Sequence, residues 1–382
     1  MNRREMLRSM AVATGAAASG LSWRAAATGV LSEGASAAYR PWREDSGNVG
    51  LLSAVRAATL AASPHNTQPW RFRVSNNQIE LFVDPSRNIG TIDPLRREQH
   101  IGTGCALENL LIAAENAGFR VSHLAYDDKS GSELIASVRF RACAPQEPML
   151  TKAIACRHTN RGPYQANRTI PGRLVDEMSR LNTEPGAIRV RFWMESPGRI
   201  RDLMIAAAEA VVADRDQSGD SAKWFRGSRA AIELHRDGTT IEAQGLSPFM
   251  TAVAKLLPEP SDSFANRVFL ATTRTVYCGP GAIFATIAVE EPCNKCVRVR
   301  VGRLWQRMHL WATTQGIAMQ PLNQIHERID REATSSAPPR FTSDLRSLMQ
   351  EPGWQGIFSF RMGYPTRHSK PSPRRDVSQC LI

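Results

Sequence analysis

The spacing of apolar positions predicts helices and strands that follow one another along the chain. Apolar residues at helical period predict helices over residues 51–62, 97–117, 199–213 and 299–315, and a further helix that begins at Pro171. Alternating or continuous apolar runs predict strands over residues 71–74, 78–83, 122–126, 135–140, 188–194, 282–289 and 356–362. Residues 224–260 carry many turn signals and no clear period. The pattern therefore predicts two compact runs, with an irregular segment inside the second.

Two of the predicted helices share one pattern. Gly104 and Gly118 have the same separation as Gly302 and Gly316, and apolar residues coincide between them at helical period. Each helix then passes through glycine into a strand-like segment. Duplication of a single helix–glycine–strand unit explains the match, and so does the chance similarity of two ordinary amphipathic helices that end in glycine.

Composition limits the class of protein. The chain has 382 residues, 42% hydrophobic and 22% charged, which is ordinary for a globular protein. Its formal net charge of +12 favours anionic partners, such as a phosphorylated cofactor or anionic lipid. No helix-turn-helix, zinc-finger or RNA-recognition signature is present, so we expect no nucleic-acid partner.

The first residues predict export. Residues 2–8 resemble the twin-arginine signal, with Arg3, Arg4, Leu7 and Arg8 in its order, and residues 10–21 are too short and mild to span a bilayer. Small residues at 35–37 offer a cleavage site. We expect a signal peptide over 1–37 that the twin-arginine machinery reads, a polar linker over 38–50 and a periplasmic or otherwise exported protein without stable membrane insertion after cleavage. A frayed amphipathic helix is the alternative.

Seven cysteines make an odd count, so at least one has no partner within the chain. Cys293 and Cys296 form the single Cys-x-x-Cys, and no second pair completes a zinc site, so we expect no metal. A structural disulfide and two free thiols both remain open, and so does a redox-active pair. Cys105 lies in an apolar helix and is expected in the core.

The stretch from Ser63 to Trp70 is unusually rich in binding groups. Two prolines, a large aromatic ring and several hydrogen-bonding side chains predict a rigid polar loop between a helix and a strand; a tight surface turn is the alternative. It resembles the Ser-x-x-Asn-x-Gln-Pro-Trp loop of the nitroreductase-like flavoproteins. That resemblance implies that Ser63 and Asn66 contact the edge of a flavin ring, while Gln68 braces the loop and Trp70 lies in the core.

Other parts of this family's flavin site are matched in the second half. Residues 157–161, followed by Ile170-Pro171, are similar to the family's Arg-Arg-Ser-x-Arg…Ile-Pro opening, and the chain closes on a basic tail. The resemblance implies cofactor contacts from Arg157, His158, Thr159, Arg161, Pro321, Leu322, Arg374 and Arg375. Arginine supplies a planar fork of charged donors, which suits the FMN phosphate. Arg157 and Arg161 share a face if a helix begins there.

The resemblance also implies an architecture. Ser63 and Asn66 lie in one half and the arginines in the other, which is the pattern of the tandem, single-chain branch of the family. We therefore expect an α+β, nitroreductase-like fold with a mixed or antiparallel sheet flanked by helices. Its halves would be residues 51–150 and 151–382, forming a monomeric pseudo-dimer with one FMN, and the insertion at 224–260 would act as a lid.

The function that follows is an FMN-dependent oxidoreductase that passes electrons to a small nitroaromatic- or quinone-like acceptor. The chemistry belongs to the cofactor, so no catalytic residue is assigned. An exported protein meets little NAD(P)H, so the electron donor is unknown. A non-catalytic FMN-sequestering protein and a flavin-free scaffold at a lipid surface are the alternatives.

Overall fold

The computed structural model describes residues 23–30, 34, 36–43, 50–194, 197–258 and 260–382. The predicted export motif and apolar segment, residue 35 of the predicted cleavage site and residues 44–49 of the predicted linker lie outside these ranges. None of the described helices is long and apolar enough to cross a bilayer.

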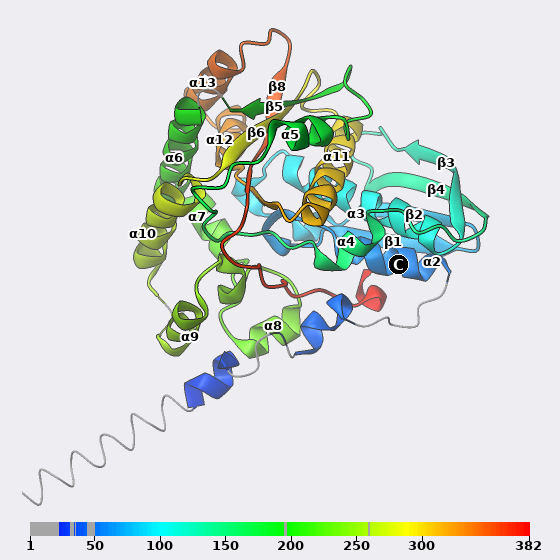
Figure 1. Cartoon of the computed structure of the whole chain (residues 1–382), viewed down its shortest axis with the longest axis horizontal. Coiled ribbons are helices and arrows are strands. Elements are labelled where there is room, and N and C mark those ends of the chain that lie inside the picture. Colours follow the sequence, from blue (N-terminus) through cyan, green and yellow to red (C-terminus); the bar gives the residue numbers. More distant parts are fainter. Residues whose placement is uncertain (1–22, 31–33, 35, 44–49, 195–196, 259) are drawn as a thin grey trace, which may run out of the picture.

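The first half is one antiparallel sheet with helices on it (Figure 1). Its strands are ordered β1-β2-β4-β3. Side chains alternate between the core and the outside in β2, where Ile79, Leu81 and Val83 are buried, as period-2 alternation predicts. The elements are α2 (Leu51–Thr59), β1 (Trp70–Ser75), β2 (Gln78–Val83), α3 (Arg97–Asn116), β3 (Phe119–Tyr126) and β4 (Leu134–Ala142).

The second half is longer and has its own antiparallel sheet, ordered β5-β6-β8-β7. Its central strand β6 is buried from Phe284 to Val289, as its continuous apolar run predicts. The elements are α4 (Thr151–Cys156), α5 (Gly172–Ser179), β5 (Ile188–Trp193), α6 (Pro197–Ala213), α7 (Arg215–Ala222), α8 (Arg229–His235), α9 (Pro248–Leu256), α10 (Asp262–Thr272), β6 (Ile283–Val289), α11 (Lys295–Thr314), β7 (Ala318–Pro321), α12 (Gln324–Ala333), α13 (Arg340–Met349) and β8 (Gln355–Gly363).

The two halves repeat one topology. In each sheet the order is first, second, fourth and third strand, and one 20-residue helix, α3 or α11, joins the second strand to the third. These helices pack on each other in the middle of the molecule (Figure 1). Gly118 and Gly316 follow them with φ of 82° and 67°, a backbone that favours glycine. The α+β class and the two fused repeats are confirmed.

Two segments differ from their predictions. Residues 38–42 were expected in a polar linker, but Ala37–Trp42 is a 3₁₀ helix in which Tyr39 and Trp42 are buried. Apolar contacts with the folded body explain this, because both rings pack inward. The irregular insertion contains the helices α8 and α9, each capped by a serine side chain, Ser228 and Ser247.

Helix α11 begins at Lys295, four residues before the predicted start. The side chain of Asn294 accepts a hydrogen bond from the backbone N–H of Val297 (3.2 Å) and so caps the helix earlier. Cys293 and Cys296 beside this cap are free, which is one of the states left open by the sequence.

The C-terminal segment crosses from the second half to the first. After β8 it runs, red in Figure 1, to the end of the first sheet near α2 and β1. Leu381 forms a parallel bridge with Phe72, and the N–H of Ile382 donates to the carbonyl of Phe72 (2.9 Å). The tail therefore adds to the edge of the first sheet and brings Arg374 and Arg375 to that half.

Candidate functional site

The loop after α2 is held in a strained conformation. His65, Asn66 and Gln68 have φ of 44°, 56° and 53°, in the left-handed region that non-glycine residues rarely adopt. The N–H of Gln68 donates to Oγ of Ser63 (3.1 Å), which closes the loop on itself. Backbone strain of this kind persists only where surrounding contacts impose it, and it is common at functional sites.

The C-terminal tail supplies those contacts. Nδ2 of Asn66 donates to the carbonyl of Pro373 (2.9 Å), and its Oδ1 accepts from the guanidinium of Arg374. The backbone N–H of Arg375 donates to Oε1 of Gln68 (2.9 Å), and its guanidinium donates to the carbonyl of Gln68 (2.6 Å). The predicted loop and the predicted basic tail, from opposite halves, thus meet in one place.

Arg157 also reaches this place. It follows α4, is 2% exposed, and donates to the carbonyl of Leu60 (2.9 Å) just before the loop. Burial lowers the pKa of Arg157 to about 10. Its Nε and that of Arg374 have no hydrogen-bond partner within the described part of the chain. Both guanidinium groups therefore keep a donor for another molecule.

Aromatic rings pack on these cations. The ring of His158 lies edge-on to Trp42, with centroids 4.5 Å apart, and the guanidinium of Arg374 lies 4.6 Å from the centroid of Trp42. Burial, then the charges of Arg157 and Arg374, lowers the pKa of His158 to about 3, so its ring is neutral at pH 7. Trp42 was missed from the sequence because it lies in an otherwise polar stretch.

The electrostatic balance of the cluster is positive. Burial and the charge of Arg157 hold the pKa of Arg374 well below its usual range. His309 on α11 is also buried beside Arg157, its Nδ1 has no described partner, and its pKa is lowered well below the usual value, chiefly by burial. Within the described ranges, no ion pair joins Arg157 or Arg374 to a carboxylate. Buried cations without counter-ions are costly, so the cluster has the chemistry of an anion-binding site.

Arg161 lies apart from Arg157. Residues 157–161 do not begin a helix, because Arg157 has extended φ and ψ and Oδ1 of Asn160 accepts from the N–H of Gly162 (2.9 Å) in a turn. The condition for a shared helical face of the two arginines is therefore not met. Arg161 donates to the carbonyl of Ala243 (3.2 Å), and burial lowers its pKa.

The remaining predicted cofactor contacts, Thr159, Pro321 and Leu322, lie at or near β7. Thr159 is half-buried between His158 and Asn160, whose N–H donates to the carbonyl of Met319 (3.2 Å) at the start of β7. Pro321 ends β7 opposite Phe360. Leu322 is buried in the second apolar cluster of the core, and its N–H donates to the carbonyl of Ser359 (2.8 Å), so its side chain is a core residue.

The insertion lies directly on the loop. Nδ2 of Asn66 donates to the carbonyl of Gly238 (3.0 Å), and the N–H of Gly238 donates in return to the carbonyl of Asn66 (3.2 Å). Nε2 of Gln68 donates to the carbonyl of Arg236 (2.8 Å). Asp237 is buried between the guanidinium groups of Arg87 (2.9 Å) and Arg226 (2.8 Å), and these ion pairs hold the segment in place.

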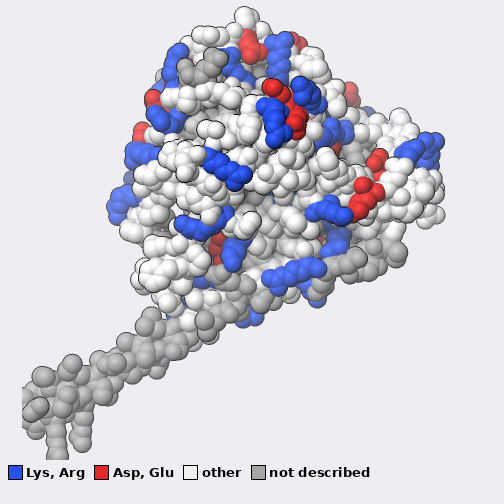
Figure 2. Space-filling view, in the orientation of Figure 1, with Lys and Arg blue, Asp and Glu red and all other residues white. Residues whose placement is uncertain are grey.

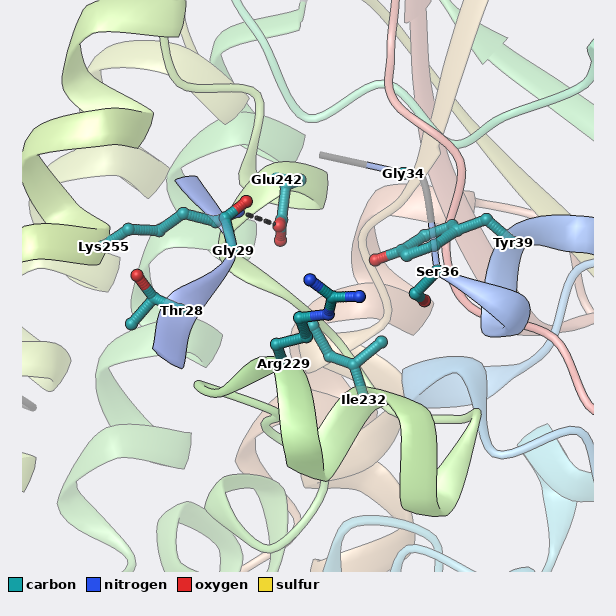
Figure 3. Close-up of a pocket in the computed structure, with 9 residues that line it drawn as sticks. All are labelled: Thr28, Gly29, Gly34, Ser36, Tyr39, Arg229, Ile232, Glu242 and Lys255. Carbon is teal, nitrogen blue, oxygen red and sulfur yellow. Dashed lines mark hydrogen bonds and ion pairs between the residues drawn. The ribbon is translucent and has the colours of Figure 1, made fainter. Parts of the chain in front are cut away.

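The insertion also approaches the backbone of residues 157–162 closely at Gly245. A Cβ there would lie 2.2 Å from the backbone nitrogen of Gly162, and its φ of 74° also favours glycine. Two of the hollows among the described residues measure ≈ 20 Å³ each, and neither of these two borders the loop, Arg157 or the tail. Figure 3 shows the one between the N-terminal segment and the insertion. Ligand pockets typically measure about 300–1,000 Å³.

These observations test FMN against the residues present. The buried, partly unpartnered guanidinium groups of Arg157 and Arg374 fit its phosphate. The polar atoms of Asn66 are taken up by Gly238, Pro373 and Arg374, so a flavin ring at the loop requires the segment 236–245 to move. The phosphate end fits this arrangement and the ring end does not.

The fold and site define an α+β protein of two fused repeats with a buried, cationic site between them.

No family model matches the sequence. The chain is 23% identical over 335 residues to a protein of Mycobacterium tuberculosis strain H37Rv that carries the provisional name NAD(P)H nitroreductase, covering 87% of this chain and 89% of the relative. It is 21% identical over 352 residues to PigM of Serratia sp. strain ATCC 39006, also provisionally named an NAD(P)H nitroreductase, covering 87% and 92%.

Solved structures give weaker matches. The FMN and NADPH-dependent nitroreductase NfnB from Sphigopyxis sp. strain HMH overlaps with a TM-score of 0.39 and 13% identity, over 62% of this chain and 98% of its own. A nitroreductase with bound FMN from Desulfitobacterium hafniense DCB-2 overlaps with a TM-score of 0.37 and 15% identity, over 61% of this chain and 97% of its own. The sequence similarity, which extends over most of this chain, is to proteins with nitroreductase names.

Proposed function

We propose that this protein is an FMN-binding oxidoreductase of the nitroreductase type, which passes electrons through one FMN to a small nitroaromatic- or quinone-like acceptor. The observation that carries the proposal is the buried cation pair Arg157 and Arg374, without a carboxylate partner in the described ranges, against the Ser63–Gln68 loop of the other half. The names of the relatives along 87% of the chain support it.

The chain's residues have separate roles in this proposal. Arg157 and Arg374 bind the phosphate through charged hydrogen bonds, and Trp42 holds the guanidinium of Arg374 in position. FMN supplies the redox chemistry, and the protein supplies orientation and exclusion of water. Ser63 and Asn66 would contact the ring edge once residues 236–245 move from the loop.

A second candidate is an FMN-sequestering protein without turnover. The contacts of Gly238 with Asn66, and of Ala243 with Arg161, favour it, because they cover the loop from the side that an acceptor would need. This segment then acts as a permanent cover, in contrast to the opening lid that turnover requires.

The visible absorption spectrum of the purified protein tests the cofactor first. We expect flavin bands that correspond to one FMN per chain. Two flavins per chain would contradict a single site divided between the halves, and a folded protein that stays colourless with added FMN would contradict both candidates.

Turnover separates the two candidates. Reduction of a quinone or nitroaromatic compound by the yellow protein, with NAD(P)H or a protein donor, supports the enzyme, and a flavin that neither donor reduces supports sequestration.

We also propose export by the twin-arginine route to the periplasm, on the strength of Arg3 and Arg4 followed by Leu7. Replacing both arginines with lysine should retain the protein in the cytoplasm, as cell fractionation would measure. Unchanged export of the Lys variant would contradict this route.

A further inference from the structure

Large apolar side chains are exposed on two consecutive helices, α9 in the insertion and α10 just after it. Phe249, 74% exposed, belongs to a set that lies on α9, on α10 and beside them: Leu246, Phe249, Met250, Leu257, Phe264 and Val268. We name this set the α9–α10 surface. Helix α10 has no buried residue. In Figure 2 the lower-left part of the molecule, where Figure 1 places α9, is mostly white. An apolar surface of this extent on a folded protein marks an interaction site.

The N-terminal segment docks next to this surface. Arg24 donates to the carbonyl of Leu257, and Nζ of Lys255 donates to the carbonyl of Gly29 (3.4 Å). Figure 3 shows Thr28 and Gly29 beside Lys255, which is paired with Glu242. The described N-terminal segment therefore lies against the end of α9. Trp23, the first described residue, is 71% exposed.

The sequence before this segment suits a lipid surface. Residues 1–22 contain Arg3, Arg4 and Arg8, one acidic residue, Glu5, and an apolar stretch over 10–21. Basic residues are attracted to anionic headgroups, and aromatic and large aliphatic side chains insert at the boundary between headgroups and acyl chains. A bilayer that holds residues 1–22 would lie against whatever surface adjoins residue 23.

We propose that the α9–α10 surface docks on an anionic lipid bilayer, with its apolar side chains in the interfacial region, and that Trp23 adds to this contact while residues 1–37 are still attached. A bilayer accepts exposed apolar side chains without a complementary groove. Because the surface belongs to the folded body, it contributes attachment that does not depend on residues 1–22. This proposal is independent of FMN binding, since none of its residues lies in the cation cluster.

Vesicle binding of the full chain tests the proposal. The wild type should bind vesicles that contain phosphatidylglycerol and bind vesicles of phosphatidylcholine alone more weakly. The double variant Phe249→Ser/Phe264→Ser should bind phosphatidylglycerol vesicles about tenfold or more weakly, because two aromatic side chains no longer leave water. Met149→Ser, equally exposed in the other half, is the matched control and should bind as the wild type does.

Amide hydrogen exchange of the wild type gives a second readout that needs no variant. Exchange should slow over residues 246–268 when phosphatidylglycerol vesicles are added. Equal binding by the double variant, or slowing only outside this range, would overturn the proposal. The proposal would also be overturned if the wild type were a dimer that does not bind vesicles and the double variant were a monomer. The surface would then be covered by a second copy of this chain.

Discussion

Gly104 on α3 and Gly302 on α11 face each other across the centre of the molecule. A Cβ on Gly302 would lie 3.0 Å from Cα of Gly104 and 1.9 Å from the carbonyl oxygen of Ile101. A Cβ on Gly104 would lie 2.1 Å from the carbonyl oxygen of Val299. Ile101 and Val299 each lie three residues before their own glycine, so the contact between the two helices is reciprocal.

Gly302→Ala should therefore destabilise the protein. The added methyl group cannot fit against backbone, so the helices must separate, at a cost of about 1–3 kcal/mol in the free energy of unfolding. Urea denaturation measures it. Gly219→Ala in α7, where nothing lies within 4 Å of the added Cβ, is the control and should be neutral or stabilising. Equal stability of the two variants would contradict the close contact.

Arg157→Met should weaken FMN binding about tenfold or more, because a charged hydrogen bond to the phosphate is worth about 1.5–3 kcal/mol. Fluorescence titration of FMN measures the affinity. Without FMN, the free energy of unfolding should change little, since the variant also removes a buried cation that has no ion pair in the described ranges. Arg139→Ala on the exposed face of β4 is the control. An unchanged FMN affinity in Arg157→Met would rule out this arginine as a phosphate ligand.

Asp237→Asn should loosen the segment that covers the loop. It removes the negative charge that Arg87 and Arg226 share, at 2.9 Å and 2.8 Å. Amide exchange over residues 236–245 should quicken about tenfold. If the protein is an enzyme, its rate of acceptor reduction should rise in the same variant. Asp262→Asn, exposed at the start of α10, should leave both rates unchanged, and unaltered exchange in Asp237→Asn would show that other contacts hold the segment.

Glu98→Gln should alter the pH dependence of stability. Burial raises the pKa of Glu98 to about 7; Arg97 opposes this shift and Asp93 adds to it. The folded protein then binds more protons than the unfolded chain between about pH 4.5 and 7, so the contribution of Glu98 to stability falls as the pH rises through this window. The variant should flatten that fall, which is on the order of 1–3 kcal/mol. Chemical denaturation across the window measures it, with exposed Glu147→Gln as the control.

Local signals were enough to predict much of the fold. The glycine spacing of 104 and 118 against 302 and 316 identified the repeat, because only glycine suits the left-handed C-caps and the close helix contact. Strand alternation located the sheets within a few residues. The loop's two prolines and its polar side chains marked it as a structured segment.

Long-range contacts account for the differences between the predicted and the observed structure. Trp42 lies in a polar stretch, and its contacts with distant residues, among them His158 and Arg374, make it part of the body. Leu322 was predicted as a cofactor contact, and its side chain is buried in the second apolar cluster of the core, which is assembled from segments far apart in the sequence. The separation of Arg157 from Arg161 depends on the turn at Asn160, which a helical spacing rule overlooks.

The clamp of Arg374 on Asn66 joins residues 308 positions apart. During synthesis, the first sheet can form long before the ribosome reaches this arginine, since domains generally fold as they emerge. The loop and its clamp therefore cannot be assembled on an unfinished chain, and retention of an anion there is possible only after synthesis has passed residue 374. Because of the order of translation, the first half can fold before an anion can be bound at this site.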